Sequence, residues 1–155
     1  MNLLSEKLKF VTGLAPVADA FSGTVTSDVV SLAKYKKALA KIIKGVGTLG
    51  TSTVTVQASA ADDGASPTAI AFKYRRIASG DTAGSVVDAT TAGFTTTAGS
   101  GDSYLIEIDA DDLPDGKPWF HIKMVEVVND PVLGGIEIIL GEPRYAGLTL
   151  PTAIV

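Results

Sequence analysis

The 155-residue sequence has no cysteine, which excludes disulfide cross-links, thiolate nucleophiles and zinc sites built on cysteine ligands. It has one histidine, His121, and no Gly-x-Ser-x-Gly motif or other nucleophile signal accompanies it. No apolar run approaches the roughly 20 residues that a membrane-spanning helix needs. We therefore expect no membrane partner, and a chain of this length suits one domain that folds without cross-links.

Charge is also scarce. Charged residues make up 19% of the chain, apolar residues make up 46%, and the formal net charge is −4. An acidic balance argues against nucleic acid as a partner, because nucleic-acid binding needs basic surface. Interface cores are depleted in charged residues, so this composition indicates that neighbouring protein covers part of the surface.

Alternating β-branched and polar residues, separated by turns rich in Gly, Pro and Asp, predict seven or eight strands. Three clear examples are TSTVTVQASA from Thr51, SYLIEID from Ser103 and WFHIKMVEVV from Trp119. With no βαβ alternation and no internal repeat, the pattern predicts an all-β fold: an antiparallel two-sheet β-sandwich, jelly-roll-like. We expect an extended N-terminal arm over residues 1–22, the sandwich domain over 23–147 and a C-terminal tail over 148–155.

The segment KYKKALAKIIKGVGTLG, residues 34–50, is ambiguous. Tyr35, Leu39 and Ile42 recur at helical spacing, and Ala, Lys and Leu favour helices. The flanking segments are strand-like, and the glycines from Gly45 to Gly50 suit either a helix end or a hairpin. The local pattern leaves both structures open.

The residue patterns of the sequence give little support for a catalytic site or a metal site. We expect His121 to be partly buried or at an interface, because no partner for acid–base chemistry can be named. The acidic residues from Asp109 to Asp115 fail as a calcium loop, since Leu113 and Pro114 occupy the fifth and sixth positions. We therefore expect neither an enzyme nor a cofactor or metal site.

Four segments resemble virion proteins of tailed bacteriophages, over roughly residues 20–150. They are DVVSLAKYKKALAKIIKGVG with STVTV, TAIAFKYRRIASGDTAG, DDLPDGKPWFHIKMVEVVNDP and EPRYAGLTLP. The resemblance implies a small β-sandwich that serves as a minor capsid, cement or decoration protein. It also favours strand–turn–strand for residues 34–50, although the comparable strand of those proteins carries more Val, Thr and Phe.

We thus expect a non-enzymatic virion protein, made in the bacterial host cytoplasm, that binds the major capsid protein at the capsid surface and stabilises the shell. We expect a homo-oligomer, with a trimer favoured. The alternative is a phage tail or fibre module that binds a receptor or carbohydrate through exposed aromatics such as Tyr35 and Trp119. We expect the lysines of residues 34–44 on a solvent- or partner-facing side of a sheet. The candidate partner-binding residues are mostly cationic: Lys36, Lys37, Lys41, Lys44, Arg75, Arg76, Arg144 and Tyr145.

Overall fold

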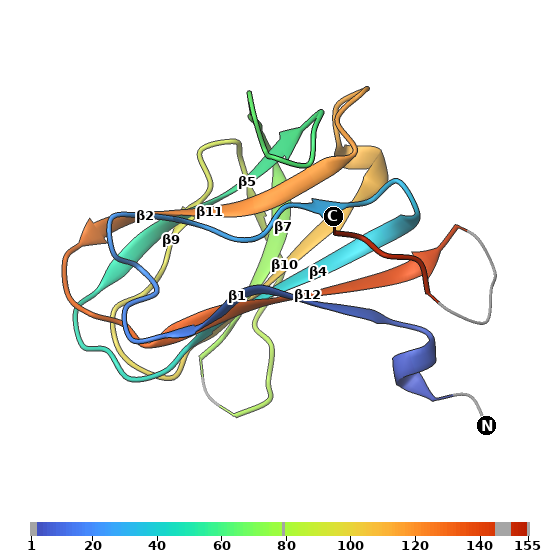
Figure 1. Cartoon of the computed structure of the whole chain (residues 1–155). Helices are drawn as coiled ribbons and strands as arrows, with labels where there is room; N and C mark the ends of the chain where they lie inside the picture. The colour runs from blue at the N-terminus through green and yellow to red at the C-terminus, as the bar shows by residue number, and fades with distance from the viewer. Residues whose placement is uncertain (1–2, 79, 145–149, 155) are drawn as a thin grey trace.

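Two antiparallel β-sheets pack face to face in the computed structural model (Figure 1), which describes residues 3–78, 80–144 and 150–154. The first sheet has six strands, in the spatial order β1 (Lys9–Val17), β12 (Gly134–Pro143), β4 (Tyr35–Lys44), β10 (Ser103–Asp109), β7 (Phe72–Ile77) and β8 (Val87–Ala89). The second sheet contains β2 (Thr24–Thr26), β11 (Trp119–Val128), β5 (Thr51–Ser59) and β6 (Thr68–Ile70), with β3 (Val30–Ser31) paired to β11 and β9 (Phe94–Thr95) paired to β5.

The strand pairs are nested along the chain. The central strand β4 pairs with β12, β5 pairs with β11, and β7 pairs with β10. This confirms the predicted antiparallel two-sheet, jelly-roll-like β-sandwich. Two short 3₁₀ helices, η1 (Leu4–Glu6) and η2 (Ala110–Asp112), complete the described structure, and no described helix has the length and hydropathy needed to cross a bilayer.

The ambiguous segment is a strand, as the resemblance favoured. Ala38, Ala40 and Ile42 of β4 are buried, and they face the second sheet at every other position. β4 is hydrogen-bonded on both sides, to β12 and β10. As a strand, the segment therefore pairs its backbone groups with two neighbours and also buries its inward side chains. Tertiary pairing here overrides a local helical preference.

The core lies between the sheets. Phe120, Ile122 and Met124 of β11 are almost fully buried, opposite the inward residues of the first sheet. An aromatic cluster closes the side near β7, where the Tyr74 and Phe94 rings stack with centroids 3.9 Å apart. These contacts hold β7 and β9 of opposite sheets together.

The predicted N-terminal arm, residues 1–22, is mostly part of the sandwich instead. Residues 9–17 form β1, which pairs with β12, and Phe21 is buried in the core. Gly13 and Pro16 interrupt the alternation of β1 in the sequence, which is why its pairing was missed. Only η1 projects from the body of the molecule (Figure 1).

The described part of the predicted tail, residues 150–154, packs against the domain. Ala153 is buried, and its carbonyl accepts a hydrogen bond from Ser31 N at 2.8 Å. The Tyr35 hydroxyl donates to the carbonyl of Pro151 at 2.6 Å. The predicted boundary at residue 148 lies outside the described residues.

Candidate functional site

The structure describes seven of the eight predicted partner-binding residues, and these seven lie in three separate places. Lys36 and Lys37 are exposed at the start of β4, and Arg144 is exposed just after β12. Arg144 N donates to the carbonyl of Lys34 at 2.9 Å, which joins the two segments. We call Lys36, Lys37 and Arg144 the basic edge. Tyr145 lies outside the described residues.

Lys41 and Arg75 lie half-buried on the outer face of the first sheet. Lys41 of β4 is opposite Glu137 of β12 on one side and Leu105 of β10 on the other, and Leu105 is in turn opposite Arg75 of β7. This row places charged side chains on β12, β4 and β7 and a leucine on β10. A mixed row of this kind suits a protein contact or a solvated sheet face.

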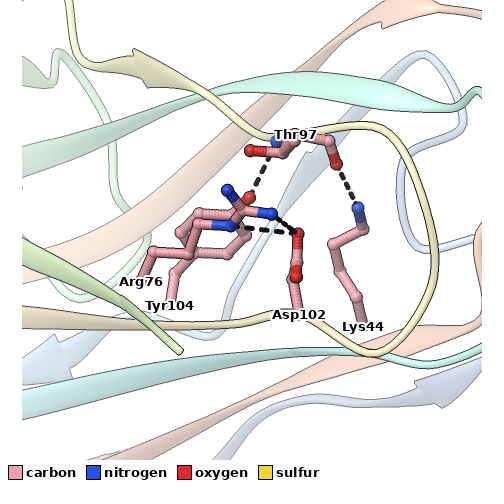
Figure 2. A network of polar contacts seen from close by, with 5 residues as sticks. All are labelled: Lys44, Arg76, Thr97, Asp102 and Tyr104. Atoms are coloured by element: carbon pink, nitrogen blue, oxygen red, sulfur yellow. Dashed lines mark hydrogen bonds and ion pairs between the residues drawn. The ribbon is translucent and has the colours of Figure 1, made fainter. Parts of the chain in front are cut away.

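Lys44 and Arg76 belong to a polar cluster at one end of the sandwich, which Figure 2 shows. The Lys44 ammonium group donates to the carbonyl of Thr97. Both Nε and Nη2 of Arg76 donate to Oδ2 of Asp102, at 3.2 and 2.9 Å. Thr97 N donates to the Tyr104 hydroxyl at 2.7 Å, so each polar group of the cluster has a partner.

Lys44 therefore does not face a partner, and that prediction is wrong. Its residue is only 3% exposed, because it follows Ala38, Ala40 and Ile42 in the inward phase of β4. Burial lowers the pKa of Lys44, the Asp102 carboxylate acts in the opposite direction, and the Arg76 guanidinium adds to the lowering. The ammonium group also lies 5.9 Å from the centre of the Phe21 ring, within the range of a cation–π contact.

The polar cluster has a structural task. It ties the loop that follows β9 to β4, β7 and β10, and Lys44 N donates to the carbonyl of Asp102 at 3.0 Å. Hydrogen bonds to charged groups in a buried site are stronger than those between neutral groups. The cluster thus closes this end of the core, with the Asp102 side chain 5% exposed and the Arg76 side chain 41% exposed at its rim.

Beyond the polar cluster, exposed aliphatic side chains gather at the same end of the molecule. Two turns meet there, the β4–β5 turn of residues 45–50 and the β11–β12 turn of residues 129–133, at the left of Figure 1. We call the following residues of these turns and of the end of β11 the apolar end: Val46, Leu49, Val127, Val128 and Leu133. Val46 is the most exposed of them, at 74%.

The apolar end is almost free of charge. Residues 45–51 contain no charged side chain, and residues 127–136 contain only Asp130. The Asp130 carboxylate accepts hydrogen bonds from Leu49 N at 2.9 Å and from the Thr48 hydroxyl at 2.6 Å. These bonds, with the Leu49 amide first, lower the pKa of Asp130. The single charge therefore fastens one turn to the other.

Backbone hydrogen bonds hold the two turns in place. Leu133 N donates to the carbonyl of Val46 at 2.9 Å, and Gly45 N donates to the carbonyl of Leu133 at 2.7 Å. The aliphatic side chains of the apolar end are thus presented on a fixed backbone. A partner that buries them need not order the turns first, which lowers the cost of association.

An apolar groove lies beside the apolar end, on the outer face of the first sheet. Its volume is about 290 Å³, and Leu14, Pro16, Ile43, Leu133 and Gly135 are among its lining residues. A Cβ atom on Gly135 would lie 2.8 Å from the carbonyl oxygen of Leu14, so a glycine is required where β1 crosses so closely. Glu137 is the one charged residue that lines this groove.

His121 is buried at 6% exposure, and its Nδ1 has no hydrogen-bond partner among the described residues. Burial lowers its pKa, and the nearby Lys123 contributes in the same direction. Gly64 of the β5–β6 loop lies against the imidazole ring. The side chain is therefore covered by a loop rather than open to a substrate.

The carbohydrate-binding alternative is limited by this arrangement. Tyr35 is fully buried, so it offers no stacking face to a carbohydrate, and Trp119 is half-buried. Within residues 3–78, 80–144 and 150–154, no group of three or more His, Asp or Glu side chains is placed to hold a metal ion.

Comparisons with known proteins leave the family open. No protein-family model and no curated protein match the chain. The fold is similar to the crystal structure of SPBc2 prophage-derived protein YomS, with 14% identity and a TM-score of 0.47 over 86% of this chain and 91% of that one. It is also similar to a chain in the structure of infectious bursal disease virus Gx strain, with 11% identity and a TM-score of 0.27 over 89% of this chain and 42% of that one. Both TM-scores are below 0.5, so neither likeness carries an argument about function.

The sequence interpretation missed the apolar end. It looked for function in the cations, whereas exposed aliphatic side chains gather at two turns and at the end of β11. The signal available in the sequence was an absence, because GVGTLGT and VVNDPVLGGI together hold one charged residue. Nothing in the sequence shows that these turns, about 80 residues apart, lie side by side.

Proposed function

We propose that this chain is a non-enzymatic structural protein that binds a protein shell and stabilises it, as a decoration or minor capsid protein of a virion. The apolar end carries the proposal. Monomeric soluble proteins rarely expose large contiguous apolar patches, and such patches mark protein interaction sites. The fixed turns and the near absence of charge suit an interface core.

The basic edge supplies a second contact, at the opposite end of β4. Lys36 and Lys37 lie near the start of this strand and Lys44 ends it, so the two surfaces lie at least about 25 Å apart. One subunit would therefore touch two neighbouring shell subunits, with aliphatic contacts at one end and lysine contacts to acidic surface at the other. Weak contacts of this kind sum over a repeating lattice through multivalency.

The assignment to a phage virion is supported by the resemblance over roughly residues 20–150, and the shell's major capsid protein is the proposed partner. The location proposed for the protein is the capsid surface. The β-sandwich itself supports a structural role only in general terms, because sandwiches host many functions.

Co-sedimentation with purified empty shells tests the proposal. The double variant Val46→Asp/Leu49→Asp places two carboxylates on the apolar end, and we expect it to lose most shell binding because these charges would be desolvated on contact. The control variant Val86→Asp/Val87→Asp changes two exposed valines at the start of β8, at the far edge of the first sheet from β1. We expect the control to bind like the unmodified protein, and equal binding by both variants would rule out the apolar end as the shell contact.

A further inference from the structure

The N-terminal 3₁₀ helix exposes two leucines that the domain does not cover. Leu3 and Leu4 are 49% and 67% exposed, and η1 buries none of its residues. The helix stands away from both sheets in Figure 1. We call Leu3 and Leu4 the N-terminal knob. Two adjacent leucines on a projecting element are suited to contact another surface.

The apolar groove described above, which we call the Gly135 groove, is a surface that can accept the N-terminal knob. It is concave and mainly aliphatic, with Ile43 and Leu133 exposed at its sides. Its volume of about 290 Å³ is at the lower end of the range for binding clefts. A groove of this size would accept small aliphatic side chains.

The knob cannot reach the groove of its own chain. Only Lys7 and Leu8 join η1 to β1, and backbone hydrogen bonds from both to the Leu4 carbonyl, at 3.0 and 3.1 Å, fix the helix against the start of the strand. Leu14 and Pro16, which line the groove, lie five to seven residues further along β1, a distance of roughly 20 Å. Any contact between knob and groove therefore joins two molecules.

The two surfaces each carry a charge of opposite sign to the other, and on the groove side Lys41 of β4 lies opposite Glu137 without forming an ion pair with it. Glu137 is the charged residue of the groove, and Lys7 is the cation next to the knob. The Glu6 carboxylate is turned to its own helix, where it accepts a hydrogen bond from Leu3 N at 3.0 Å. The ion pairs found among the described residues, Lys73–Asp88 and Arg76–Asp102, involve neither Lys7 nor Glu137.

We propose that the N-terminal knob of one copy of this chain fills the Gly135 groove of a second copy, with Lys7 facing Glu137. Each copy carries one knob and one groove, so the contact closes into a two-fold dimer where the exchange is reciprocal and otherwise repeats from copy to copy in a ring or an open chain. The two edges of the first sheet are less suited to self-association than the groove. At the β1 edge, Asp28 N already donates to the Gly13 carbonyl at 2.7 Å, and Pro16 has no N–H to offer. At the other edge, β8 spans only Val87–Ala89.

A mixing experiment on the isolated protein tests this assembly by analytical ultracentrifugation. The variant Leu3→Ser/Leu4→Ser keeps the groove but lacks the knob, and Ile43→Lys keeps the knob but blocks the groove. Each variant alone should self-associate about 100-fold more weakly than the unmodified chain, because two leucine burials are lost or a cation is forced into apolar surface. Mixed together, they should form a one-to-one dimer and nothing larger.

Three more variants complete the test. Val86→Ser, at an exposed valine away from both surfaces, should assemble like the unmodified chain. Glu137→Lys should weaken assembly, and Lys7→Glu in the same chain should restore it. A monomeric unmodified protein, unchanged assembly of the knob variant, or a mixture that stays monomeric would overturn the proposal. No shell is present in these measurements, so this contact and shell binding can fail separately.

Discussion

At the scale of single residues, the lysines of β4 differ in how far they are exposed to solvent. Lys36 and Lys37 are exposed, Lys41 is half-buried, and Lys44 is inside. Alternation from Ala38 through Ile42 already assigns Lys44 to the inward face. The partners of Lys44 could not be predicted from sequence, because Thr97 and Asp102 lie more than 50 residues away in the chain.

The lowered pKa of Lys44 predicts a pH dependence of stability. Between the folded pKa and the unfolded value of 10.5, the unfolded chain holds a proton that the folded chain has released, so the free energy of unfolding rises with pH across that window. Lys44→Met should abolish this rise. The difference between the two proteins, measured by urea unfolding, should change by no more than about 1.4 kcal/mol per pH unit.

The buried Tyr35 also affects stability at alkaline pH, and the comparison of the two proteins removes its effect. Burial raises its pKa above 10.0, so above that pH the unfolded state loses a proton first and stability falls. The fall is common to both proteins and cancels in their difference. If the difference is flat from neutral to alkaline pH, Lys44 does not lose its proton more readily in the folded state.

His121 makes a matching prediction on the acid side. Burial lowers its pKa below 6.5, so as the pH falls below that value the unfolded chain takes up a proton that the folded chain resists, and stability decreases. His121→Gln keeps a polar side chain that does not titrate. Between about pH 7 and pH 5, the unmodified protein should lose more stability than the variant, as measured by urea unfolding, and parallel curves would contradict the burial of a neutral imidazole.

At the scale of elements, the strands with clear alternation, β5, β10 and β11, were predictable from sequence, and β4 needed more than its own residues. Its helical spacing is real, but the hydrogen bonds that β12 and β10 offer on both sides decide its structure. β1 was missed because its register shifts between Thr12 and Leu14 and again before Val17. A bulged edge strand leaves no regular period to find.

The two turns of the apolar end depend on Gly50. A Cβ atom at this position would lie 2.1 Å from the carbonyl oxygen of Asp130, so Gly50→Ala forces the β4–β5 and β11–β12 turns apart. We expect a loss of about 3 kcal/mol in the free energy of unfolding. Gly141→Ala in β12 is the matched control, because its added Cβ would meet only Leu8 Cδ2, at 3.5 Å.

The control should change stability by less than about 1 kcal/mol. Chemical denaturation of both variants at one pH gives the comparison. Equal stabilities of Gly50→Ala and Gly141→Ala would show that the two turns are not packed as closely as described.

At the scale of the whole molecule, the sandwich is polarised along β4. One end carries the basic edge, and the other carries aliphatic turns whose single charged residue is Asp130, next to the Lys44 cluster. The composition indicated a covered surface, since 46% of residues are apolar and 19% are charged, but it could not locate that surface. Its position depends on which turns the nested strand order brings together, and that order is a property of the complete fold.

The central claim is that this protein stabilises a shell to which it binds. The most direct test is the rupture temperature of purified shells, measured by differential scanning calorimetry with the protein, without it, and with Val46→Asp/Leu49→Asp. We predict a higher rupture temperature with the unmodified protein, because a ligand that binds only the intact state stabilises it, and no increase with the variant. The same rupture temperature in all three samples would contradict the account.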